Sequence, residues 1–175
     1  MTALAEGEMT ATERADLLQT LDTHRGFLRF TAQGISDEDA RRRTTVSALT
    51  IGGLIKHVTR GEEQWADFAV RGPEAIGNFD PASIEAHAST FEMGADETLA
   101  GLLQRYEEVA RRTDDLVRTS SSLDASYPLP EAPWFEPGAR WSARRALLHI
   151  IAETAQHAGH ADIIREALDG QKTMG

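Results

Sequence analysis

The 175-residue sequence contains no cysteine. This absence excludes disulfide bonds, zinc–thiolate sites and a cysteine nucleophile within the chain. A bound metal ion would therefore have to be held by histidine, aspartate or glutamate. Any thiol chemistry would need a sulfur atom supplied by a cosubstrate.

Basic side chains and long apolar runs are also scarce. Lysine and arginine number 18 against 28 acidic residues, which gives a net charge of −10. With no basic tract beyond residues 41–43, nucleic acid is not expected as the main partner. No apolar run approaches the length of a membrane span, so we expect no transmembrane segment. The acidic N-terminal sequence has no hydrophobic signal core, which predicts a cytoplasmic protein.

Apolar residues recur at helical spacing in four long segments, and no segment shows a convincing strand pattern. These segments begin near residues 10–12, 50, 96 and 142, with Asp96 as the expected cap of the third. At this length we expect a single domain over residues 1–175. The pattern predicts an all-α, four-helix bundle with long connections at 71–94 and 120–141. Because the first connection can cross the whole bundle, we expect an up-down-down-up order.

Ionisable residues interrupt the inward faces of two of these helices. His57 lies inside the apolar stripe of the second helix, whereas Glu62 falls on the side expected to face water. Glu153 and His157 are four residues apart on the fourth helix, so they project from one side. Together with His57 they would form a nitrogen–oxygen ligand set with an open position, typical of catalytic metal sites in a bundle core. Such a set suits zinc, nickel, iron or manganese.

Each of these residues also has a plainer interpretation. A lone inward histidine such as His57 is more often a hydrogen-bonded core residue than a ligand, and Glu153 with His157 can be an ordinary helical ion pair. Neither a Glu-x-x-His pair nor an H-E-x-x-H motif occurs, which argues against a di-iron centre and a zinc protease. His24 and His87 fit neither inward face and are expected at the surface. The residues alone therefore leave the metal site a hypothesis.

Two motifs carry a family resemblance. The stretches T-I-G-G-L-I-K-H at 50–57 and H-I-I-A-E-T-A-Q-H-A-G-H-A-D-I-I-R-E-A-L-D-G at 149–170 resemble the DinB-like superfamily. In particular, the chain is similar to an actinobacterial branch long filed as a domain of unknown function, and to the metal-binding domain of mycothiol-dependent maleylpyruvate isomerase. The resemblance covers nearly the whole chain. It implies an up-down-down-up bundle that binds a divalent metal, with zinc or nickel expected first, through His57, Glu153 and His157.

The resemblance also suggests a function. It implies a metal-dependent enzyme that uses a low-molecular-weight thiol of the mycothiol type and a small electrophile, for S-transfer or isomerisation. His160 and His149 are the candidate catalytic bases, and each also competes with Glu153 for the third ligand position. The candidate cosubstrate-binding residues are Trp65, Trp134 and Trp141.

Two other interpretations stay open. The first is a non-catalytic, stress-related interaction module that binds a metal without turnover, because members of a superfamily often keep a fold while changing function. The second is a metal-free cluster of polar side chains. A homodimer formed through an outer helix face is compatible with each of them.

Overall fold

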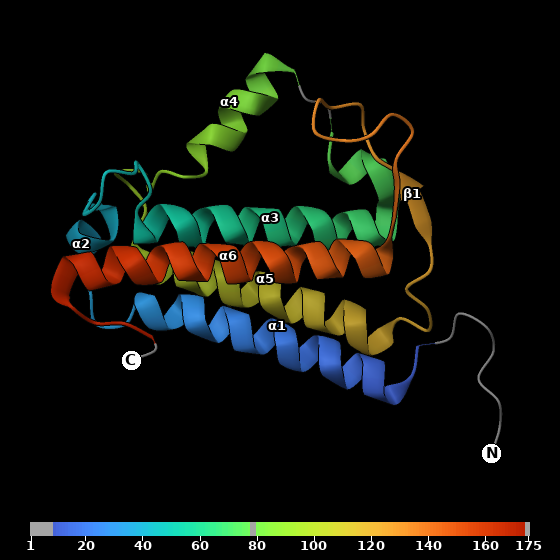
Figure 1. The fold of residues 1–175 in the computed structure, drawn as a ribbon, viewed down its shortest axis with the longest axis horizontal. Coiled ribbons are helices and arrows are strands. Elements are labelled where there is room, and N and C mark those ends of the chain that lie inside the picture. Colours follow the sequence, from blue (N-terminus) through green and yellow to red (C-terminus); the bar gives the residue numbers. More distant parts are fainter. Residues whose placement is uncertain (1–8, 78–79, 174–175) are drawn as a thin grey trace.

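The structure, a computed structural model, describes residues 9–77 and 80–173 and is mainly helical. Four long helices lie alongside one another (Figure 1): α1 (Ala11–Thr31), α3 (Ile51–Arg71), α5 (Leu99–Thr119) and α6 (Ala143–Asp169). Shorter helical segments occupy the connections: α2 (Asp37–Arg41), the 3₁₀ helix η1 (Gly72–Ala75) and α4 (Pro81–Ser89). The predicted all-α class is therefore confirmed.

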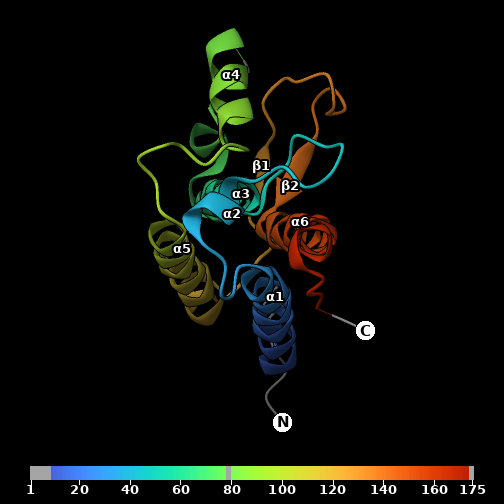
Figure 2. The ribbon, with the colours of Figure 1, turned by 90° about the vertical axis from the view of Figure 1, so that its left-hand side faces the viewer.

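The four long helices surround a common interior, as the end-on view in Figure 2 shows. In Figure 1, α3 and α5 run from left to right, whereas α1 and α6 run in the opposite direction. Helix α6 packs against both α1 and α3, and α3 packs in turn against α5. Their apolar faces meet in the core, which includes Leu28, Leu54, Val58, Tyr106, Val109, Ala158 and Ile164.

The helix boundaries follow from local capping. The long helices α1, α3 and α6 begin near the predicted positions, after the caps Thr10, Thr50 and Ser142, whose hydroxyl groups accept backbone N–H donors three residues on. For α1 the sequence leaves Thr10 and Thr12 as alternatives. Helix α5 differs from the prediction, because its cap is Thr98 rather than Asp96. The Thr98 hydroxyl accepts from the Gly101 amide at 3.1 Å, so the helix begins one half-turn later than expected.

A two-stranded hairpin corrects the expectation that the chain contains no strands. Strands β1 (Ser126–Pro128) and β2 (Arg140–Ser142) pair antiparallel, with Tyr127 opposite Trp141. Three-residue strands are too short to produce a recognisable alternation of apolar and polar residues. The Tyr127 hydroxyl donates to the Val70 carbonyl at 3.1 Å and thereby ties the hairpin to the end of α3.

The sequence prediction for Glu62 is wrong. Its side chain is fully buried, where it forms an ion pair with Arg25 of α1. Arg25 also donates to Asp114 of α5 at 2.8 Å, so one buried guanidinium joins three helices. Helical periodicity could not reveal this pair. A charged side chain is stable at a buried position only when another helix supplies a partner of opposite charge, and periodicity within one helix does not show that partner.

No helix within the described ranges is long and apolar enough to cross a membrane.

Candidate metal centre

Three side chains converge where α3 and α6 lie side by side. One donor atom each from His57, Glu153 and His157 lies within 4.8 Å of the others. The Glu153 Oε2 atom is 3.5 Å from His157 Nε2 and 4.0 Å from His57 Nε2. Two ligands bound tetrahedrally to one ion at ~2.1 Å are about 3.4 Å apart, so small side-chain movements would complete such a site. The donor set fits a divalent metal.

His57 is held in a largely apolar environment. It is 7% exposed, and its ring stacks on Phe91 with centroids 3.8 Å apart. Burial, together with the neighbouring His157 and His87, lowers the pKa of His57 to about 4. The imidazole is therefore neutral near pH 7, as a metal ligand must be.

Thr90 determines which nitrogen of His57 carries the proton. The Thr90 hydroxyl lies 2.6 Å from the His87 carbonyl oxygen, which can only accept, so the hydroxyl donates to it. The same hydroxyl oxygen lies 2.9 Å from His57 Nδ1 and must accept from that nitrogen. His57 consequently carries its proton on Nδ1 and leaves the Nε2 lone pair free toward Glu153. Outer hydrogen bonds of this kind orient metal-binding histidines.

The paired glycines at the start of α3 allow the Thr90 segment to reach His57. A Cβ atom on Gly53 would collide with the backbone carbonyl of Phe91, and one on Gly52 would collide with the Met93 side chain. Residues after α4 therefore cross the first turn of α3 at backbone contact distance. This crossing places Thr90 and Phe91 against His57.

His160 contacts a candidate ligand but lies outside the three-residue cluster. Its Nδ1 is 3.3 Å from His157 Nδ1, so a proton on His157 Nδ1 would leave His157 Nε2 free to face Glu153. In the other tautomer His157 donates from Nε2 to Glu153; this hydrogen bond is the main cause that lowers the pKa of Glu153, and His149 and His57 add to it. The Glu153 side chain is 39% exposed and is the most accessible of the three.

His149 continues the site along α6, toward a pair of stacked tryptophans. Its Nε2 is 4.0 Å from Glu153 Oε1, and burial lowers its pKa. The His149 ring makes edge contacts with Trp65 and Trp141, which stack on each other at 4.8 Å. Trp134 is 60% exposed. Its ring contacts that of Phe135, which in turn contacts Trp141.

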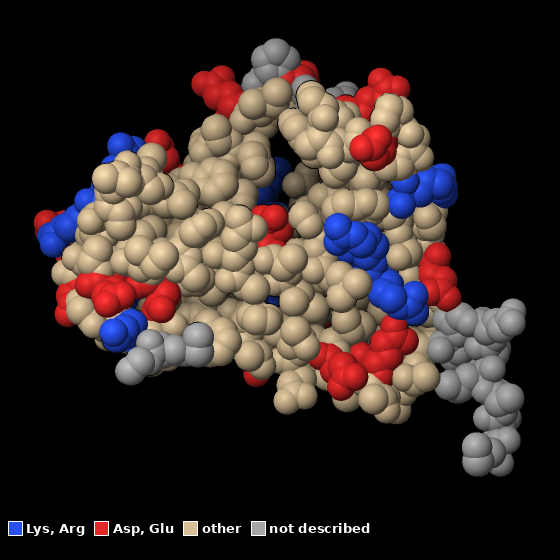
Figure 3. All heavy atoms as spheres, in the orientation of Figure 1, with Lys and Arg blue, Asp and Glu red and all other residues tan. Residues whose placement is uncertain are grey.

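The cluster lies beside the bundle core rather than inside it. Its neighbours Thr90 and Phe91 follow α4, which projects away from α3 on the side opposite α1 and α5 (Figure 1). Figure 3 shows the surface hollowed between α4 and the loop that joins β1 to β2. A ligand can therefore approach the seam between α3 and α6 without entering the core.

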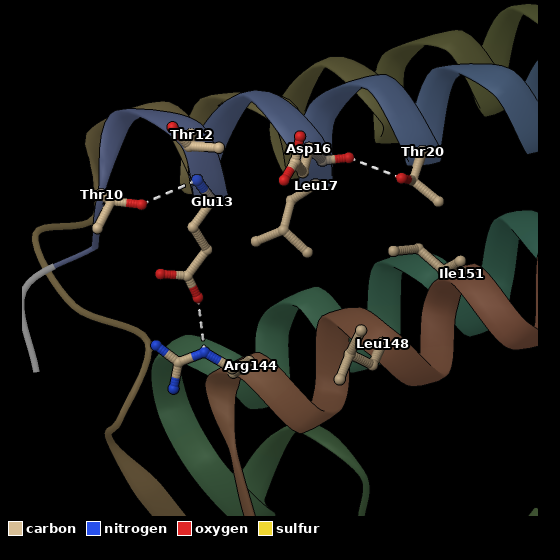
Figure 4. Close-up of a pocket in the computed structure, with 9 residues that line it drawn as sticks. All are labelled: Thr10, Thr12, Glu13, Asp16, Leu17, Thr20, Arg144, Leu148 and Ile151. Atoms are coloured by element: carbon tan, nitrogen blue, oxygen red, sulfur yellow. Dashed lines mark hydrogen bonds and ion pairs between the residues drawn. The ribbon is translucent and has the colours of Figure 1, made fainter.

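A second concavity lies elsewhere on the molecule. A groove of about 520 Å³ runs between the first turns of α1 and α6, where Arg144 pairs with Glu13 at 2.7 Å (Figure 4). Threonine, acidic and aliphatic side chains line it, and none of the predicted site residues does. The chemistry-bearing side chains gather at the other seam, so that seam is the candidate site.

The two histidines predicted at the surface differ in their surroundings. His87 is exposed, yet its ring lies 5.2 Å from that of His57 and therefore borders the site. His24 is partly buried against Phe27 on α1 and does not contact the cluster. Sequence spacing missed His87 and Thr90 because both belong to a connection whose position depends on tertiary packing.

Comparisons with known proteins agree with this fold. A solved structure of a conserved protein from Enterococcus faecalis has a TM-score of 0.66 at 15% identity, over 93% of this chain and 99% of that chain. A mutant of mycothiol-dependent maleylpyruvate isomerase has a TM-score of 0.59 at 16% identity, over 91% of this chain and 62% of that chain. At these identities the similarity shows a common fold alone. A search of curated proteins found no significant match.

A family comparison goes further than the structural ones. Residues 16–170, nearly the whole chain, match the mycothiol-S-transferase family. The match agrees with the resemblance carried by the motifs at 50–57 and 149–170. The chain therefore belongs to the mycothiol-S-transferase family.

Proposed function

We propose that this protein is a divalent-metal-dependent enzyme that transfers a mycothiol-type thiol to a small electrophile, or isomerises a substrate by thiol addition and elimination. The observation that supports this most directly is the convergence of His57, Glu153 and His157 beside a surface hollow. Three protein ligands leave a coordination position open, as catalytic sites do. The family match supports a thiol cosubstrate, and the absence of cysteine requires that its sulfur come from outside the chain.

His57, Glu153 and His157 would hold the metal, with zinc or nickel expected from the family resemblance among the metals that this donor set suits. A bound metal lowers the pKa of a coordinated thiol and so supplies a thiolate near neutral pH. His149 would accept the thiol proton; burial lowers the pKa of His149, which favours the unprotonated imidazole that this role needs. His160 would act through its contact with His157 and orient that ligand.

The aromatic side chains would shape the rest of the pocket. The stacked pair of Trp65 and Trp141 would close the seam beyond His149, and exposed Trp134 would cover the entrance. Apolar walls exclude water from the neighbourhood of a thiolate, which protects it from competing reactions.

The proposal includes one DinB-like domain over residues 1–175 and an up-down-down-up bundle. The helix directions in Figure 1 support that order. The cytoplasmic location and the homodimer stay predictions.

The test begins with metal content. We expect purified wild-type protein to retain about one divalent ion per chain and His157→Ala to lose it, with His24→Ala as a matched control on α1. Equal metal content in wild type and His157→Ala would refute the site. Metal-loaded wild type is then assayed with mycothiol and a panel of electrophiles. Metal binding without thiol transfer would indicate the non-catalytic module instead.

A further inference from the structure

Arg145 extends the row of polar side chains that forms the candidate site. Arg145, His149, Glu153 and His157 follow one another at intervals of four residues on α6, so they lie along one side of the helix. The rise of α6 places Arg145 about 12 Å from Glu153. Figure 3 shows Lys and Arg side chains over the first turns of α6, beside the hollow. The row therefore ends in a cation one helical turn before His149.

The Arg145 guanidinium is held in place but is not neutralised. It lies over the Trp141 ring, 4.3 Å from the centroid. No carboxylate within residues 9–77 and 80–173 lies at ion-pair distance from it. Its neighbour Arg144, by contrast, pairs with both Glu13 and Asp124. Arg145 is exposed, so its charge is available to an anionic ligand.

A guanidinium that lies over a ring can keep its hydrogen-bonding edge available to a ligand. A guanidinium uses its face to stack on an aromatic ring and its edge to donate two parallel hydrogen bonds to a carboxylate. Trp141 is itself supported by Trp65, which stacks on it at 4.8 Å. The side chain is thus ordered before a ligand arrives, which reduces the entropy lost on binding.

We propose that Arg145 binds the carboxylate of an anionic electrophile whose reactive carbon is then presented to the thiol sulfur at the His57–Glu153–His157 cluster. This inference rests on the proposed function and adds the class of the electrophile.

Binding tests this inference without requiring turnover. Benzoate and benzamide have the same shape but differ in charge, and their dissociation constants are measured by calorimetry on metal-loaded protein. We expect wild type to prefer benzoate and Arg145→Gln to lose about tenfold in benzoate affinity. Arg145→Lys should retain more of the preference than Arg145→Gln, and Arg111→Gln, an exposed arginine on α5, should retain all of it. Equal affinity of wild type for the two ligands would overturn the inference.

Turnover provides the second measurement. The electrophiles are 4-chloro-3,5-dinitrobenzoate and its carboxamide; the thiolate sulfur bonds to the carbon that bears chlorine, and chloride leaves with its electron pair. We expect the ratio of kcat/KM for carboxylate over carboxamide to fall about tenfold in Arg145→Gln, mainly through KM. An unchanged ratio in this variant would refute the role of Arg145. No turnover with either electrophile in wild type would refute the proposed function, while the benzoate titration would still decide the binding role.

Discussion

Replacing Thr90 with valine would test the hydrogen bond that orients His57. Valine keeps the shape of threonine but has no oxygen to accept the proton on His57 Nδ1, which now donates at 2.9 Å. The imidazole must then either leave a buried N–H unpaired or move its proton to Nε2. Because Nε2 is the nitrogen that faces Glu153, either result weakens the metal site.

The expected magnitude follows from the burial of this bond. His57 is 7% exposed and Thr90 is 8% exposed, so water is poorly placed to replace the lost acceptor. Loss of a hydrogen-bond partner behind a metal ligand lowers metal affinity by about 10- to 100-fold, which is about 1.4–2.7 kcal/mol. The free energy of unfolding of the metal-free protein should fall by about 1–3 kcal/mol, the cost of one unsatisfied buried donor.

Two measurements check this prediction. Competition with a chromophoric chelator gives the metal affinity, and long-range ¹⁵N–¹H NMR of the metal-free wild type identifies the tautomer of His57. Thr90→Ser should restore most of the affinity. Thr59→Val is the matched control, because that buried hydroxyl donates only to the Ile55 carbonyl of its own helix. Wild-type affinity in Thr90→Val, or a proton on Nε2 in the wild type, would refute the reasoning.

Two further predictions concern the same region. Gly53→Ala should reduce both stability and metal affinity, because its Cβ atom would collide with the backbone that crosses α3. Gly61→Ala, on the same helix with open space around it, should be neutral or stabilising by up to about 1 kcal/mol. Equal changes in the free energy of unfolding for the two variants, measured by chemical unfolding, would contradict this. The metal-free protein should also lose up to about 3 kcal/mol of stability as the pH falls from 6.5 to about 4. The unfolded chain takes up a proton on His57 throughout this range and the folded chain does not, so a free energy of unfolding that is flat between pH 7 and 4.5 would be inconsistent with the burial of His57.

The sequence predicted the helices well because their signals are local. Ser142 and Gly170 mark the two ends of α6 by capping geometry that involves only neighbouring residues. The failures have non-local causes. Glu62 is buried because Arg25 reaches it from another helix, and the hairpin forms because distant residues pair across a loop.

In the candidate site, too, the residues with local signals could be predicted and those that depend on tertiary packing could not. Glu153 and His157 could be placed together from their spacing on one helix, and His57 from its position in an apolar stripe. Thr90 could not be placed, because the segment after α4 has no periodic pattern that fixes its position. One signal was nevertheless present: Gly52 and Gly53 interrupt the first turn of a helix, where each costs about 1 kcal/mol relative to alanine. Adjacent glycines at such a position indicate that another backbone passes close by.

Adjacent residues of α6 serve different surfaces, which explains how one helix can carry both the core and the site. Successive side chains on a helix are rotated by about 100°. Thr154 and Ala158 are therefore buried in the bundle, while Glu153 and His157, one residue earlier in each case, face the seam with α3. The same rotation separates Arg144, which ties α6 to Glu13 of α1, from its neighbour over Trp141. Because the two sets share one backbone, the packing that positions α6 also positions the ligands.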